Sequence, residues 1–153
     1  MARGIEHLVV LFPCCLTARR RLCPTTLDEV KLAIKLSEEE GTRVVYIVTG
    51  GRADHTLQER QELAEQTRLE LHQLHPALSD WIQARGLIHE IEQVAELAKL
   101  YPNAKRLDLI APKSLYKRAV HLWQRIVEHK GFRRLYVKIH LEFYDVEDRH
   151  HHD

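Results

Sequence analysis

The sequence lacks a long apolar segment and an excess of charge of either sign. Its longest apolar run, residues 8–12, is only strand length, whereas a membrane helix needs roughly 18 apolar residues. The 23 Lys and Arg residues nearly balance the 22 Asp and Glu residues, so the chain has no general attraction for nucleic acid or anionic lipid. No apolar block of the signal-peptide kind follows Met1. We therefore expect a cytoplasmic protein with neither a membrane nor a nucleic-acid partner.

Cysteine is scarce, with three residues in the whole chain: Cys14, Cys15 and Cys23. An odd count argues against a disulfide framework, and adjacent cysteines pair only with strain. No metal site is predicted, because His72 and His75 have no cysteine pair at zinc spacing beside them. Cys14 or Cys15 could supply a nucleophile activated by the arginines that follow, but buried, inert thiols are the commoner outcome. No catalytic residue is predicted.

The chain does contain alternating patterns of strand and helix. Residues 5–12 and 43–49 are predicted strands built around the apolar runs 8–12 and 44–48, a pattern typical of parallel strands buried on both faces. Between them, Thr26 and Glu29 form a capping-box pattern that opens an amphipathic helix reaching about Glu40. Strand, helix and strand in this order predict two parallel strands of one sheet.

The rest of the chain continues the alternation. A second capping box, Thr56 with Glu59, opens a long polar helix that Pro76 ends. After it we predict a short helix at 79–84, a very short strand at 86–88, a helix at 90–101, a strand at 106–111 and a helix at 114–129. The fold class is therefore α/β: a single three-layer Rossmann-like domain, residues 1–148, with a mainly parallel sheet of about five strands. Residues 149–153 form a His-rich tail too short to fold, expected to be disordered.

The last strand, at residues 133–144, differs from the others. Apolar residues from Leu135 to Phe143 alternate strictly with polar ones, which indicates one buried and one wetter face. This pattern is typical of an edge strand, or of a strand whose outer face meets a partner. A homo-oligomer formed through this strand is the corresponding hypothesis.

A ligand site is predicted at the carboxyl ends of the strands, where open α/β sheets bind their ligands. Cys14 follows the first strand, Gly50, Gly51 and Arg52 follow the second, and Lys113 and Ser114 follow a third. Gly-Gly lets backbone amides approach a ligand, and the helix starting near Ser114 would point its positive end there. Together these favour a phosphate or carboxylate. The alternative is an ordinary tight turn beside a solvated basic face.

Arg118 and Glu92 complete the predicted site. Arg118 heads an apolar helical stripe, so it is expected to pair with a carboxylate, to hold a ligand anion, or to keep its head in water above the stripe. Glu92 is the candidate partner, although an ordinary first-turn acid has the same position. The run of three arginines at 19–21 could grip phosphate or simply be solvated.

The order of these pieces resembles the YdcF-like family, which also contains SanA and ElyC domains. The likeness rests on Thr49-Gly50-Gly51 after a buried strand, on Ile91-Glu92-Gln93 near a helix start, and on the segment from Pro112 to Ala119 with Ser114 and Arg118. The family's glycine turn after the first strand is replaced by Phe12-Pro13-Cys14, and Leu115 stands where the family has histidine. The resemblance implies a nucleotide-like ligand, S-adenosylmethionine among the candidates, without a settled reaction.

The leading functional prediction is a cytoplasmic domain that binds a small anionic or nucleotide-like ligand at the strand ends, with no reaction assigned. The alternative is a non-enzymatic interaction or oligomerising protein whose site is vestigial.

Overall fold

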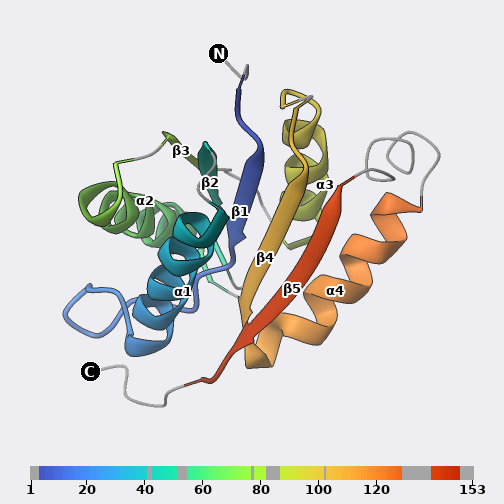
Figure 1. The fold of residues 1–153 in the computed structure, drawn as a ribbon. Helices are drawn as coiled ribbons and strands as arrows, with labels where there is room; N and C mark the ends of the chain where they lie inside the picture. The colour runs from blue at the N-terminus through green and yellow to red at the C-terminus, as the bar shows by residue number, and fades with distance from the viewer. Residues whose placement is uncertain are drawn as a thin grey trace.

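The chain folds into strands and helices that alternate around one sheet (Figure 1). The computed structural model describes residues 4–40, 43–51, 55–76, 78–81, 87–101, 103–128 and 139–148. The strands are β1 (His7–Leu11), β2 (Val44–Val48), β3 (Leu78–Trp81), β4 (Arg106–Pro112) and β5 (His140–Val146). The helices are α1 (Pro24–Glu40), α2 (Leu57–Leu74), α3 (Leu87–Ala98) and α4 (Lys113–Val127). The predicted α/β class with a parallel sheet is confirmed.

The strands lie in the order β3-β2-β1-β4-β5, and every neighbouring pair is parallel. β1 is central, with His7 opposite Val44 of β2 and opposite Arg106 of β4. From β1 the chain first builds outward through β2 and β3, then returns to the other side of β1 with β4. The direction of winding therefore reverses between β1 and β4, the kind of position at which open α/β sheets leave a crevice.

Two apolar cores lie on the two faces of the sheet. One contains Leu8 and Val10 of β1 with Ile91 of α3 and Trp123 of α4. The other contains Val9 and Leu11 of β1 with residues of α1 and α2. Successive side chains of a strand point to opposite faces, so the uninterrupted apolar run of β1 fills both cores at once. In the described ranges, no helix combines the length and the apolarity needed to cross a membrane.

Two predictions between α2 and α3 are wrong. Leu78–Trp81 is strand β3, paired with β2 from Val45 to Val48, where a short helix was predicted. Without β3 the outer edge of β2 would leave buried backbone groups unpaired, and this tertiary demand outweighs the local pattern. The predicted strand at 86–88 is wrong at Leu87 and Ile88, which begin α3; Gly86 and residues 82–84 lie outside the described residues.

β5 lies at the edge of the sheet, as predicted, and pairs only with β4. In its described part, Ile139, Leu141 and Phe143 pack against the core under α3 and α4, while His140 is exposed. The opposite face of β5 is less exposed to solvent than predicted, because Tyr144 packs against the core that lies under α1 and α2. The strand also continues to Val146, and the predicted residues 133–138 lie outside the described ranges.

The Gly50–Gly51 turn holds the end of β2 against the chain that leaves β1. Gly51 has a φ of +73°, and a Cβ built on it would lie 2.1 Å from the carbonyl oxygen of Pro13. A Cβ on Gly50 would lie 2.8 Å from Cβ of Arg60 in α2. Both positions therefore need glycine for close packing of backbone, whatever else the turn does.

We predict that Gly51→Ala destabilises the fold by about 2–5 kcal/mol, because left-handed strain and a backbone clash add together. Gly4→Ala is the matched control: its φ is +91°, but the new Cβ would meet only the Arg43 side chain, at 3.3 Å. The control should lose only about 1–2 kcal/mol. Urea denaturation measures both variants, and equal losses would contradict the proposed contact with Pro13.

Candidate functional site

The backbone amide of Gly50, predicted to face a ligand, is instead bound by the protein itself. It donates a hydrogen bond to the carboxylate of Glu90 in α3. Glu90 also forms an ion pair with Arg60 of α2, and both side chains are almost fully buried. Arg60 donates a further hydrogen bond, 3.0 Å long, to the carbonyl of Gly51. An internal carboxylate thus occupies the anion-binding position of the turn.

Burial of this pair has an electrostatic consequence. Desolvation lowers the pKa of Arg60 from its usual value, although arginine stays charged at any physiological pH. The buried guanidinium therefore requires a negative partner, and Glu90 supplies it. Since α2 contributes Arg60, α3 contributes Glu90 and the turn after β2 contributes the Gly50 amide and the Gly51 carbonyl, the network ties three elements together at one point.

The start of α4 is also occupied from within the chain. Ser114 donates its backbone amide to Asp148, at 2.8 Å, and its hydroxyl to the same carboxylate. Lys113 donates to Glu147, at 2.9 Å, and this bond raises the pKa of the lysine. The segment after β5 thus places carboxylates where a ligand anion was predicted.

The remaining predicted residues do not gather around a common site. Glu92 and Arg118 are exposed on α3 and α4, and no hydrogen bond or ion pair between described atoms joins them. Cys14 is buried just beyond β1. Arg52 lies outside the described residues. The expected Glu92–Arg118 pair is therefore not formed, and Arg118 is exposed on α4.

A hollow of about 220 Å³ does lie at the carboxyl end of β1, on the side facing α2. Residues 15–18 and Arg20 of the loop after β1 form one wall. His55 and Glu59 at the start of α2, with Leu63 one turn further on, form the other. The hollow therefore has an apolar floor and a polar rim, the combination found in small-molecule sites.

The loop that forms this wall is held in shape by its own contacts and by α2. Leu16 and Leu22 form an antiparallel bridge across its base. At its tip Arg20 has a φ of +59°, and its guanidinium donates to Glu62. Gln66 donates to the Arg20 carbonyl at 2.8 Å. A left-handed non-glycine residue costs on the order of 1–3 kcal/mol, and such residues cluster at functional sites.

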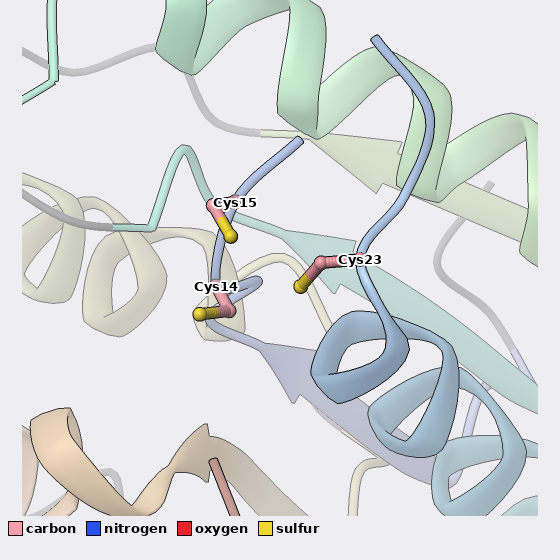
Figure 2. A group of neighbouring side chains, drawn as sticks. All are labelled: Cys14, Cys15 and Cys23. Carbon is pink, nitrogen blue, oxygen red and sulfur yellow. The ribbon is translucent and has the colours of Figure 1, made fainter. Parts of the chain in front are cut away.

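The three cysteines come together beside the hollow, where the chain leaves β1 and enters α1 (Figure 2). Their sulfur atoms all lie within 4.8 Å of one another. Cys14 and Cys23 are buried, whereas Cys15 is partly exposed and lines the hollow. Cys14 and Cys15 are adjacent in the sequence, so their proximity was evident from the sequence alone. Cys23 comes close to them because the loop after β1 folds back before α1 begins.

The start of α1 holds these residues in place. Cys23 immediately precedes the first helical residue, Pro24, and its sulfur accepts a hydrogen bond from the amide of Thr26. The hydroxyl of Thr26 accepts from the amide of Cys14 at 3.0 Å. Hydrogen bonds from Cys14 and Cys15 lower the pKa of the Cys23 thiol, and Thr26 adds to the effect. The pKa of Cys14 is raised, first by its bonds to the other two sulfurs and then by burial.

Glu29 of α1 is the second unexpected group near the cysteines. The predicted capping box with Thr26 is wrong, because α1 already begins at Pro24 and the Thr26 hydroxyl binds Cys14. The carboxylate of Glu29 is fully buried, and neither oxygen has a hydrogen-bond partner among the described atoms. Burial and then the nearby Cys23 sulfur raise its pKa well above the usual value.

Arg60→Met tests whether the buried network holds the site. The variant keeps the bulk of the side chain but leaves Glu90 buried without its charge partner, so we predict a loss of about 3–5 kcal/mol of stability. Arg68→Met is the matched control on the same helix, where the exposed pair with Glu65 contributes less than about 1 kcal/mol. Chemical denaturation of both variants makes the measurement, and similar small losses would show that the network does not hold the turn.

Comparison with protein-family models and with curated proteins does not assign a function to this site, so the function is argued from the chain's own residues. No family model matches the chain, and no curated protein matches it in sequence. The resemblance to the YdcF-like family therefore remains a prediction carried by the Thr49-Gly50-Gly51 turn and its neighbours.

Proposed function

We propose that this protein binds a small anionic or nucleotide-like ligand in the hollow between the loop after β1 and the start of α2. The observation that carries the proposal is the position of the hollow at the carboxyl end of the central strand of a parallel sheet. The Rossmann-like strand order and the YdcF-like sequence pattern support the same ligand class, with S-adenosylmethionine or a nucleotide as candidates. No reaction is assigned.

The charges around the hollow favour an anion. Arg20 and His55 line it, and Arg19 and Arg21 are exposed beside it on the same loop. Glu59 opposes them, but its carboxylate is engaged by Thr56 in the capping box of α2, and this bond lowers its pKa. Glu62 is also present and is paired with Arg20. Even so, the three arginines outnumber the two glutamates around the opening, which raises the local concentration of an anionic ligand.

The size of the hollow limits the ligand. Sites for drug-sized molecules measure roughly 300–1,000 Å³. At about 220 Å³, this hollow fits one compact moiety, such as a phosphoryl group with part of its sugar. The rest of a nucleotide would extend over the arginine-bearing rim. The three cysteines form no disulfide, which fits a reducing compartment, and we place the protein in the cytoplasm on that ground.

A thermal-shift screen tests the proposal. Phosphate, adenine nucleotides and S-adenosylmethionine form the panel, and a ligand present at a hundred times its Kd adds about 2.7 kcal/mol of stability. We predict that Arg20→Met abolishes the shift caused by the best ligand. The variant should itself fold normally, since the Arg20–Glu62 pair is largely exposed.

Arg19→Met is the control, because Arg19 is exposed on the same loop but does not line the hollow. It should keep most of the shift. A panel without any shift, or a shift that Arg20→Met leaves intact, would refute binding at this place.

A homo-oligomer is the second candidate, favoured by the outer edge of the seven-residue β5, where no described strand pairs with it. An exposed edge strand offers unpaired backbone groups to another copy of the chain. The prediction is a dimer at micromolar concentration by multi-angle light scattering. A monomer at every concentration measured would eliminate this candidate without affecting the ligand proposal.

A further inference from the structure

We propose that Cys14, Cys15 and Cys23 form a binding site for a thiophilic d¹⁰ metal ion such as Zn²⁺, with the buried carboxyl group of Glu29, on the helix that Cys23 immediately precedes, as the acid that balances its charge. This site is separate from the anion-binding function above. Its support is the convergence of the three sulfur atoms, and Glu29 adds a buried acid without a hydrogen-bond partner among the described atoms.

The arrangement of the sulfur atoms is close to what a metal requires. Zinc–thiolate bonds of about 2.3 Å at tetrahedral angles place the sulfur atoms about 3.8 Å apart. All three sulfurs here lie within 4.8 Å of one another, so small side-chain rotations suffice to close the site. Figure 2 shows the side chains of Cys15 and Cys23 turned toward each other from the two sides of the loop.

The backbone around the cysteines is already fixed. Cys23 donates its amide to the carbonyl of Cys15, at 3.2 Å, which joins the two ends of the loop. The amide of Cys14 is held by Thr26 at 3.0 Å. In the first turn of α1 the amide of Thr26 donates to the Cys23 sulfur, and such a helix terminus stabilises the negative charge of a thiolate. Metal binding would therefore require little ordering of the chain.

Glu29 is a buried acid whose charged form a bound cation would stabilise. Burial raises its pKa well above the usual value, so without a cation the carboxyl group is favoured in its neutral, protonated form. No described atom bonds to either oxygen of Glu29, which lies on α1, the helix that Cys23 immediately precedes. A metal held by the three sulfurs would supply the missing positive charge. Binding would displace the thiol protons to solvent.

A disulfide is the competing use of the same cysteines. It would join only two of them, leave the third sulfur and Glu29 unexplained, and need an oxidant. A metal ion would instead engage all three sulfurs at once and leave the fourth position of a tetrahedral site for one further donor.

Cobalt titration of the full chain, reduced and stripped of metal with a chelator, tests the proposal. We expect one equivalent of Co²⁺ to give sulfur-to-cobalt charge-transfer absorption with the strong visible bands of tetrahedral coordination, and Zn²⁺ to displace it. The chain has only three cysteines, so sulfur bands can arise only from this cluster. Binding by the histidines at 150–152 would give no such band. A thiol reagent should count three reactive groups without metal, after unfolding, and none in the folded zinc form.

Variants separate the ligands from their surroundings. Cys15→Ser and Cys23→Ser should each weaken binding by about 100-fold or more. Glu29→Gln should weaken it by about 10–100-fold, whereas Glu38→Gln, an exposed change on the same helix, should have no effect. Far-ultraviolet circular dichroism checks that each variant is folded, and the titration of the unchanged protein does not depend on any of them.

Three results would overturn the proposal. The first is absence of sulfur-to-cobalt absorption at one equivalent of metal. The second is unchanged affinity in folded Cys23→Ser protein. The third is an intramolecular disulfide in protein whose thiols were trapped directly in lysed cells, seen as a mass lower by two hydrogens. Unchanged affinity in Glu29→Gln would overturn the role of the carboxylate.

Discussion

The ion pair of Arg60 and Glu90 is the interaction on which this end of the molecule depends. Neither group could remain charged in the interior without the other, so α2 and α3 are joined across the end of β2. Glu90 also accepts a hydrogen bond from the amide of Gly50, and Arg60 donates one to the carbonyl of Gly51. The two bonds together fix the position of the Gly50–Gly51 turn. That position presses Gly51 against Pro13 and so fixes where the loop after β1 begins.

The hollow and the cysteine cluster both follow from the placement of that loop. Between Pro13 and Cys23, which precedes α1, the chain forms a loop. The antiparallel bridge between Leu16 and Leu22 joins the two arms of this loop. The outer part of the loop leans on α2 through Arg20 and leaves the hollow beneath it. Its two ends meet at the cysteines. A ligand and a metal would therefore occupy neighbouring places built by one segment of ten residues or so.

The sequence predicted the parallel α/β layout well, because uninterrupted apolar runs such as that of β1 are typical of parallel strands that are buried on both faces. It did not predict β3, whose four residues owe their conformation to the edge of β2 rather than to any pattern of their own. For the candidate site, the sequence predicted a location at the strand ends. It named Glu92 as the candidate carboxylate of that site, whereas in the structure Glu92 is exposed and Glu90 is the buried one. Residues two apart on a helix face different directions, and spacing alone could not show which one meets Arg60. The convergence of Cys23 on Cys14 and Cys15 depends on loop closure, which leaves no periodic trace in the sequence.

The same reasoning explains why the hollow lies between the loop after β1 and the start of α2, and not at the reversal of strand order between β1 and β4. The crevice at that reversal normally offers a free helix start, but here the start of α4 is bound by Asp148 and its neighbouring lysine by Glu147. A carboxylate tethered to the end of β5 has a high effective concentration at this helix start, so a free anion would compete poorly with it. On the α2 side the competing carboxylate is Glu62, but its ion pair with Arg20 is largely exposed and therefore weak. An anion that approaches the strand ends therefore meets the exposed arginines of the loop after β1, Arg19, Arg20 and Arg21.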